Sequence, residues 1–220
     1  MLESDHLNEL GKAFVDQDAR LSHGLEALGV SLSPARRGLL LEYLALMVRW
    51  NRAYNLTTVD QPAEMVSRHL LDSLSIQPWL VGRQVLDAGT GAGLPGVPLA
   101  VACPERQFLL VDSNGKKIRF LRQVRRALKL DNIEPVHGRL EDLPDDLQPD
   151  CITARALAPL ERLVVWHRRW LDQGACLLAM KAQLAENERL AVPDAYNVEI
   201  IDLEVPGLDA RRCLAIITKK

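Results

Sequence analysis

The fold is decided by residues 85–96, which read Val85-Leu86-Asp87-Ala88-Gly89-Thr90-Gly91-Ala92-Gly93-Leu94-Pro95-Gly96. The run starts as a short apolar segment typical of a buried strand, and the glycines that follow predict a tight turn into a helix. Because glycine has no side chain and tolerates positive φ, the backbone amides of such a turn can approach a ligand closely. The stretch therefore predicts a ligand-binding turn between a strand and a helix.

An acidic residue ends the next apolar run. The strand predicted over residues 108–111 leads into Asp112, roughly 20 residues after the glycine turn. In nucleotide-binding folds an acid at this place accepts hydrogen bonds from both hydroxyls of a ribose. The glycine turn and Asp112 together indicate a cofactor that contains a nucleoside.

Short apolar runs alternate with helical patterns from residue 84 onward, which is typical of β-α-β units and a parallel sheet. Only a short link around residues 206–209 separates the last two predicted strands. Because a link this short cannot hold a parallel crossover, the last strand must pair antiparallel to its neighbour. We expect an α/β fold with a seven-stranded, mostly parallel sheet and an antiparallel last strand, the strands being residues 85–88, 108–111, 133–136, 151–154, 175–180, 198–205 and 213–218.

Two kinds of cofactor fit this turn. Gly91, Gly93 and Gly96 satisfy the G-x-G-x-x-G pattern of dinucleotide-binding proteins, which leaves a nicotinamide cofactor open. Asp87 at the end of the strand would repel a pyrophosphate, whereas it balances the charge of a sulfonium or an ammonium group. Asp87 and the antiparallel last strand favour S-adenosylmethionine, bound at Asp87, Gly89, Gly91 and Gly93.

The segment before the sheet has helical patterns only. Leu7, Leu10, Phe14, Leu21 and Leu25 recur at steps of three and four residues. A second helix is predicted to begin at Ser33-Pro34, a capping residue followed by a proline at the first helical position. We expect a helical extension over residues 1–80 and a methyltransferase domain over residues 81–220, packed as one compact unit.

Composition limits the classes of partner. The net charge of −2 excludes a globally basic nucleic-acid binder, so contact with RNA requires a local basic patch. No apolar run approaches the ~20 residues that cross a bilayer, and residues 1–12 lack the pattern of a signal peptide. Cys103, Cys151, Cys176 and Cys213 are widely spaced and lack histidines at metal spacing. We therefore expect a cytoplasmic protein with reduced cysteines, no membrane contact and no metal.

A local basic patch is present on the helix predicted over residues 115–130. Ile118, Leu121, Val124 and Leu128 form its inward face, and the rest of the helix carries no acid. Positive charge on one helix face indicates contact with a phosphate backbone, although a solvated basic face remains the alternative. The candidate RNA-binding residues on this helix are Lys116, Lys117, Arg119, Arg122, Arg125 and Arg126.

Beyond these patterns the chain resembles a known family almost from end to end. The resemblance is carried by ordered blocks: Trp50-Asn51-Arg52-Ala53-Tyr54-Asn55-Leu56-Thr57, Arg68-His69-Leu70-Leu71-Asp72-Ser73, Asp87 to Pro98, Val111-Asp112-Ser113, Lys116-Lys117-Ile118-Arg119-Phe120-Leu121 and Arg155-Ala156. These blocks are similar to those of the bacterial RsmG (GidB) family, whose members methylate N7 of a guanine in 16S ribosomal RNA.

The resemblance implies a class I methyltransferase fold of the Rossmann-like type that depends on S-adenosyl-L-methionine. It implies guanine 527 as the target, 16S rRNA or the small ribosomal subunit as partner, and a monomer. Two departures from the family are Ala154 and Ala182, where relatives commonly have serine and glycine. The cofactor contacts that it implies are Gly89, Leu94, Asp112, Leu140, Glu141 and Arg155.

Guanine N7 has an in-plane lone pair, so we expect no general base and a catalysis that consists of alignment and exclusion of water. Arg155, Lys181 and His69 are the positioning candidates, with Arg68 on the RNA side, although a histidine at such a place is more often a packed helix residue than a ligand. A nucleoside-binding assembly module without methyl transfer stays open as the alternative function. A third hypothesis is a methyltransferase of small molecules or an NAD enzyme.

Overall fold

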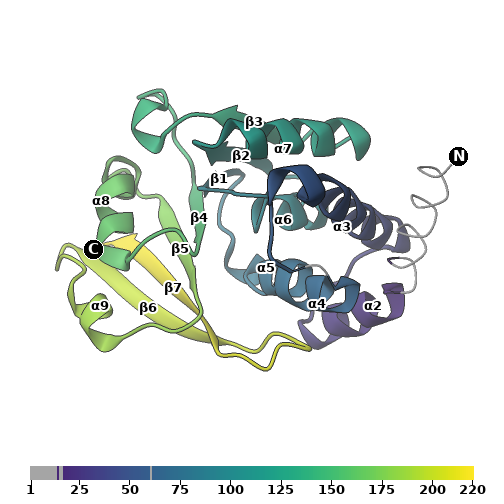
Figure 1. The fold of residues 1–220 in the computed structure, drawn as a ribbon. Coiled ribbons are helices and arrows are strands. Elements are labelled where there is room, and N and C mark those ends of the chain that lie inside the picture. The colour runs from purple at the N-terminus through teal and green to yellow at the C-terminus, as the bar shows by residue number, and fades with distance from the viewer. Residues whose placement is uncertain (1–13, 15–16, 60) are drawn as a thin grey trace, which may run out of the picture.

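The computed structural model of the protein describes Phe14, residues 17–59 and residues 61–220. The predicted helical positions Leu7 and Leu10 and the segment 1–12 lie outside the described residues. The helical elements are α2 (Asp18–Ala27), α3 (Pro34–Tyr54), α4 (Pro62–Met65), η1 (Val66–Leu71), α5 (Asp72–Leu74), η2 (Gln77–Trp79), α6 (Gly96–Ala102), α7 (Gly115–Ala127), η3 (Leu140–Asp142), α8 (Leu160–Leu171) and α9 (Glu186–Leu190) (Figure 1).

A seven-stranded sheet with the order β3-β2-β1-β4-β5-β7-β6 forms the centre of the molecule. The strands β1 to β5 pair in parallel, whereas β7 is antiparallel to both β5 and β6. The predicted antiparallel last strand is therefore confirmed, and it lies inside the sheet rather than at its edge. The strands are β1 (Gln84–Ala88), β2 (Gln107–Asp112), β3 (Ile133–His137), β4 (Cys151–Arg155), β5 (Cys176–Lys181), β6 (Tyr196–Leu203) and β7 (Arg212–Lys219).

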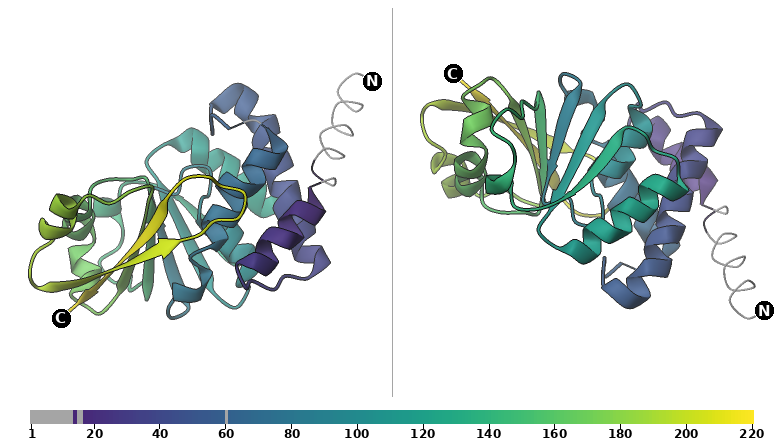
Figure 2. Two further views of the ribbon diagram at one scale, coloured as in Figure 1. Left: turned by 90° about the horizontal axis from the view of Figure 1, so that it is seen from below. Right: turned by 90° about the horizontal axis from the view of Figure 1, so that it is seen from above.

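Helices cover both faces of the sheet, because successive residues of a strand point to opposite sides. Val85 packs into a core shared with α3, α6 and α7, whereas the next residue, Leu86, packs into a second core with α8. The helices α2 to α5 lie together at one side of the molecule, away from α8 and α9 (Figure 2). No helix among the described residues is long and apolar enough to cross a membrane.

The helical segment shares its core with the sheet. Ser33 caps α3 as predicted, since its side chain accepts the Arg36 amide, and Pro34 is the first helical residue. Within α3 the buried Tyr43 hydroxyl donates to the Ala92 carbonyl at 2.7 Å. The helix α3 thus supports the glycine turn directly.

Residues 62–74 form one continuous helical run that changes its winding in the middle. The segment η1 is a π-helix, in which the Asp72 amide donates to the carbonyl of Ser67, five residues earlier. Arg68 and His69 lie on a helix as predicted, but the π-helical winding was not predicted from the sequence. Such turns occur frequently at functional sites.

Candidate functional site

A cavity of about 570 Å³ opens at the carboxyl ends of the strands. It lies where the strand order reverses between β1 and β4, which is the usual ligand site of open α/β sheets. The two sides of the cavity differ in chemistry. The side that we name the glycine half comprises Gly89, Thr90, Gly91, Asp112 and Lys117, and the side that we name the arginine half comprises His69, Asp72, Arg155, Lys181 and Arg212.

The glycine half is formed by the turn after β1. Gly91 has a φ of 61°, lines the cavity, and a Cβ placed there would contact the Gly89 carbonyl and Lys117 Nζ at 3.9 Å. Any side chain at this position would therefore be strained and would occupy part of the cavity. At Gly96, by contrast, a Cβ would collide with Asp87 and Leu110. The turn needs Gly91 for the ligand space and Gly96 for its own packing.

Asp112 holds the turn from the end of β2. Its Oδ2 accepts the Gly91 amide at 2.9 Å, and its Oδ1 accepts the Asn114 amide at 2.8 Å. A carboxylate offers about four lone-pair sites, two on each oxygen. One acceptor site on each oxygen therefore remains for a ligand, and Lys117 Nζ lies 3.7 Å from Oδ2.

Asp87 lies beneath the turn rather than in the cavity wall. Its carboxylate is fully buried and accepts the hydroxyls of Thr90 at 2.5 Å and Thr153 at 2.9 Å, together with the Gly96 amide at 2.9 Å. Burial raises the pKa of Asp87, and these three donors oppose the rise. Asp87 therefore does not line the cavity, its carboxylate faces the turn and the sheet, and its predicted contact with a cofactor stays a prediction.

Of four more residues predicted to bind a cofactor, two line the cavity and two lie outside its wall. Gly89 and Leu94 line the cavity, whereas Leu140 and Glu141 do not. Both of the latter lie on η3 after β3, where the Leu140 carbonyl accepts Arg169 and Glu141 is exposed. Gly93 also lies behind the wall, where a Cβ would meet Val97 and Leu121.

The arginine half is organised around a buried carboxylate. Asp72, whose side chain is 5% exposed, accepts Arg155 Nη1 on Oδ2 at 3.0 Å and Arg212 Nε on Oδ1 at 3.1 Å. Arg155 Nη1 also donates to the Arg68 carbonyl at 3.1 Å. The guanidinium group of Arg68 itself pairs with Glu64 at 2.7 Å and does not line the cavity.

His69 lines the arginine half as a neutral group. Its Nε2 lies 2.9 Å from the Thr57 hydroxyl, and Thr57 is held by both ends of the Asn51 amide. Burial, and next the charge of Arg155, lower the pKa of His69 to about 4. The ring is therefore uncharged at neutral pH.

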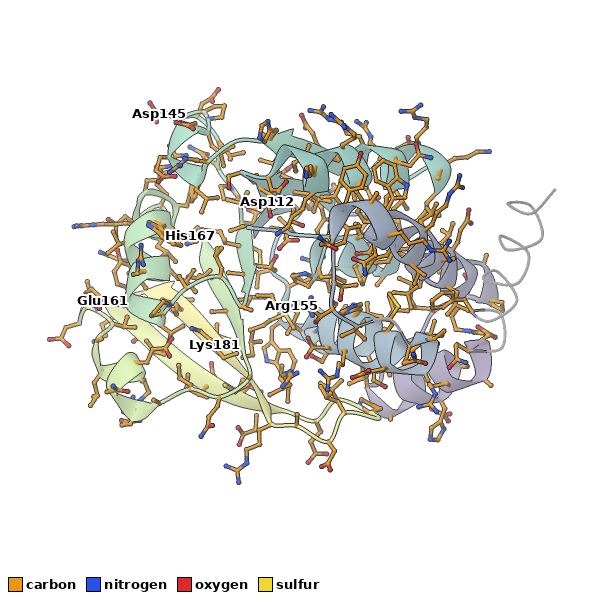
Figure 3. The ribbon with its side chains drawn as sticks, in the orientation of Figure 1. Asp112, Asp145, Arg155, Glu161, His167 and Lys181 are labelled. Atoms are coloured by element: carbon orange, nitrogen blue, oxygen red, sulfur yellow. The ribbon has the colours of Figure 1, made fainter. Side chains whose placement is uncertain are left out.

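Lys181 lines the cavity at the end of β5, as predicted, but its ammonium group is engaged. Lys181 Nζ donates to the Ala158 carbonyl at 2.7 Å and to Glu188 Oε1 at 2.5 Å. The same Glu188 oxygen accepts the Leu160 amide at 2.9 Å. Lys181 thus ties α9 and the start of α8 to the cavity rim, and Glu188 neutralises its charge. Figure 3 shows Asp112, Arg155 and Lys181 across the middle of the molecule, with His167 and Glu161 apart from them on α8.

The basic helix α7 has the predicted amphipathic form. Ile118, Leu121 and Val124 are buried, and Asn114 caps the helix by accepting the Lys116 amide at 3.0 Å. Lys117 differs from the other basic residues of the helix, because it lies in the cavity wall beside Asp112. The basic residues with exposed side chains are Lys116, Arg119, Arg122, Arg125 and Arg126.

Asp72 and Arg212 are the charged residues of the cavity wall that were not predicted from the sequence. An acid within the apolar stripe of a helix is a signal for Asp72, because such a residue is buried only with a partner. Arg212 has no comparable local signal.

Among the described residues no group of three or more His, Cys, Asp or Glu side chains is arranged to hold a metal ion.

Comparison with solved structures gives the same fold. A crystal structure of a SAM-dependent methyltransferase from Aquifex aeolicus matches with a TM-score of 0.55, at 18% identity, over 74% of this chain and 96% of the other. A tRNA (uracil-54, C5)-methyltransferase from Pyrococcus abyssi, solved with S-adenosyl-L-homocysteine, matches with a TM-score of 0.53 over 72% of this chain and 39% of that one, at 18% identity. The class I methyltransferase fold expected from the sequence is confirmed.

Comparison of sequences identifies the family as well as the fold. The ribosomal RNA small subunit methyltransferase G of Pseudomonas syringae is 46% identical over 200 residues, which are 90% of this chain and 94% of the relative. The protein of the same name from Escherichia coli is 43% identical over 199 residues, 90% of this chain and 96% of the relative. Residues 37–215 match the family described as rRNA small subunit methyltransferase G. The chain belongs to the rRNA small subunit methyltransferase G family.

Proposed function

We propose that this protein transfers the methyl group of S-adenosylmethionine to N7 of a single guanine in 16S ribosomal RNA, acting as a monomer. The proposal is supported chiefly by the cavity, which joins a cradle for a nucleoside with a cationic half that has no general base. The family supplies the substrate class, since the relatives are named as small-subunit rRNA methyltransferases.

The glycine half fits the cofactor. Asp112 retains one acceptor site on each carboxylate oxygen, which matches the two hydroxyls of a ribose. Gly91 lines the cavity without a side chain, which leaves room for a ligand against its backbone. When bound here, S-adenosylmethionine supplies an electrophilic methyl group.

The titratable groups of the arginine half favour a nucleophile that needs no deprotonation. Both oxygens of Asp72 accept guanidinium groups, and His69, with a pKa of about 4, is a weak base. Burial raises the pKa of the Cys213 thiol, which keeps that group protonated. A ring nitrogen with its own lone pair, such as guanine N7, suits this environment, whereas an exocyclic amine would require a base.

The side chains of the cavity then contribute to catalysis by orienting the substrate and excluding water. Arg155, fixed by Asp72, directs N–H groups toward the cavity, and the loop at Leu56 and Thr57 closes the cavity from the side of α3. Alignment of the reacting atoms and exclusion of water supply the rate enhancement. The exposed basic residues of α7 supply contacts with the phosphate backbone.

The test is methyl transfer from labelled S-adenosylmethionine to small-subunit rRNA, both naked and assembled in subunits that lack the modification. We expect label at one guanine as 7-methylguanine. This base carries a positive charge and a labile imidazolium ring, so borohydride followed by aniline cleaves the RNA at the modified nucleotide. Primer extension then maps the position.

Each possible result separates one part of the proposal from another. Label on a ribose, on an exocyclic amine or on a small metabolite would refute the N7 assignment and leave the cofactor assignment standing. Binding of rRNA without transfer to either form of substrate would favour the assembly module instead.

A further inference from the structure

We infer that Arg212, held by Asp72 beside Arg155, binds a phosphate group of the nucleotide that carries the target guanine. The inference rests on the proposed function and adds to it a binding subsite at the start of β7. Its basis is the geometry of three side chains drawn from separate parts of the chain, Asp72 on α5, Arg155 on β4 and Arg212 on β7.

The carboxylate fixes both arginines. Each oxygen of the buried Asp72 accepts one guanidinium group, Arg155 at 3.0 Å and Arg212 at 3.1 Å. The side chains of Arg155 and Arg212 are 23% and 21% exposed, so each keeps a surface toward the cavity that it lines. Fixing a guanidinium before a ligand arrives reduces the entropy that binding costs.

Several donors are left over for a ligand. A guanidinium has five N–H groups. Arg212 uses Nε on Asp72 and Nη1 on the Arg211 carbonyl at 2.8 Å, and Arg155 uses Nη1 on Asp72 and on the Arg68 carbonyl. Among the described residues neither Nη2 donates to a protein acceptor within hydrogen-bonding distance.

The charge of the cluster suits an anion. Two guanidinium groups face one carboxylate, which leaves one positive charge at the cavity wall. The neighbouring Lys181 is neutralised by Glu188, and His69 is uncharged at neutral pH. Phosphate oxygens accept paired N–H groups from arginine with good geometry, so a phosphate is the natural ligand of this cluster in an RNA-binding cavity.

The chemistry of the reaction argues against contact of Arg212 with the reactive edge of the base. An arginine that reads guanine binds O6 and N7 together, and N7 must instead face the methyl group. Methylation also places a positive charge on the ring, which a guanidinium beside it would repel. The uncharged residues His69, Thr57 and Leu56 are available for the base, and the arginines for its phosphate.

Binding of an RNA fragment that contains the mapped guanine tests the assignment, with Arg212→Gln compared against Arg211→Gln. Arg211 is exposed, adjacent in sequence and outside this cavity, so its replacement removes the same charge. We expect Arg212→Gln to weaken RNA binding roughly 10- to 150-fold and to reduce the salt slope by about 0.7, with the affinity for S-adenosylmethionine unchanged. Arg211→Gln should change RNA affinity less than about threefold.

The phosphate itself is identified with RNA fragments that carry a neutral methylphosphonate on one side or the other of the guanine. At one of the two positions the neutral linkage should weaken binding to the wild-type protein and have no further effect on Arg212→Gln, because coupled changes are not additive. Arg212→Lys, which keeps the charge, should restore the salt slope and so exclude a folding defect as the cause.

Additive losses at both positions would overturn the inference, and so would a loss confined to the affinity for S-adenosylmethionine, which would assign Arg212 to the cofactor. Wild-type RNA affinity in Arg212→Gln would overturn it as well. Failure of the proposed function is recognised separately, since the wild-type protein would then transfer no methyl group to either form of rRNA.

Discussion

The two halves of the cavity are built in different ways. In the glycine half, Asp112 contacts Gly91, which is 21 residues earlier in the chain, and the whole turn lies between two consecutive strands. In the arginine half, Asp72 contacts residues 83 and 140 positions away, Arg155 and Arg212. The first half is a local structure that recurs across the fold, and the second exists only after the helical segment and the last strand have packed together.

We propose that the glycine half carries the chemistry common to the fold and that the arginine half selects the substrate. The solved structures at 18% identity share the fold of this chain, with TM-scores of 0.55 and 0.53. The helices α2 to α5, which place His69 and Asp72 in the cavity, precede β1. We therefore expect damage to the glycine half to affect folding and cofactor binding, and damage to the arginine half or to α7 to affect RNA.

The largest expected effect is that of Asp87→Ala on stability. The substitution leaves the Thr90 and Thr153 hydroxyls and the Gly96 amide without their acceptor in a fully buried place. Loss of such a network should lower the free energy of unfolding by about 3 to 5 kcal/mol, measured by urea titration.

Asp150→Ala is the matched control for this measurement. Asp150 also accepts two backbone amides, those of Arg83 and Gln84, but it is exposed, so water can replace it. We expect a loss of about 1 kcal/mol. Equal losses in the two variants would contradict the role that burial gives to Asp87.

The next effect concerns the affinity for the cofactor. Asp112→Ala removes a charge-assisted acceptor of the ribose and should weaken binding of S-adenosylmethionine roughly 10- to 150-fold, measured by titration calorimetry. Asp131→Ala removes an exposed acid and serves as the control. Unchanged affinity in Asp112→Ala, or tighter binding of NAD than of S-adenosylmethionine, would reject the cofactor assignment.

Lowering the pH should destabilise the folded protein through protonation of His69 in the arginine half. The pKa of His69 is lowered from 6.5 to about 4, so between these values the unfolded chain binds a proton that the folded chain does not. The stabilisation is complete above pH 6.5 and is lost as the pH falls toward 4. Between pH 7 and pH 5 the loss should be about 2 kcal/mol in the free energy of unfolding.

His167 provides the comparison outside the cavity. It is buried on α8, where burial likewise lowers its pKa to about 4. His69→Gln and His167→Gln should each remove about half of the combined dependence of the unfolding free energy on pH, and the double variant should remove most of it. A single variant with the full dependence would show that its histidine is already protonated in the folded protein at pH 5.

Sequence alone predicts the sheet closely, because each strand is a short apolar run between turn residues. The strands predicted at residues 85–88 and 151–154 are observed at Gln84–Ala88 and Cys151–Arg155, and the antiparallel last strand follows from the short link before it. The place of Asp112 at the end of the second predicted strand is confirmed as well, whereas its hydrogen bond with the Gly91 amide was not predicted.

The parts that were missed depend on packing rather than on local pattern. Whether Asp87 faces the cavity or the space beneath the turn is decided by Thr153, which lies 66 residues away on β4. Lys181 lies at the predicted strand end, but its pairing with Glu188 depends on how α9 packs. Arg212 belongs to the site because β7 inserts beside β5, and no local pattern indicates which of its residues faces Asp72.

The smallest expected effect tests whether RNA binding extends from the arginine half onto α7. Arg122, Arg125 and Arg126 are exposed on this helix, and none of them lines the cavity. Changing all three to Glu should weaken rRNA binding about tenfold at physiological salt and lower the salt slope by about 2, because each arginine neutralises up to one phosphate. The affinity for S-adenosylmethionine should stay the same, since Lys117 and Asp112 are intact.

The control variant changes Arg162, Arg168 and Arg189 to Glu, which changes the net charge by the same amount. These residues lie on α8 and α9, at the other side of the molecule (Figure 1). Equal weakening by the two triple variants would mean that rRNA senses only the overall charge of the protein, and unaltered binding in the α7 variant would leave that helix as a solvated basic face.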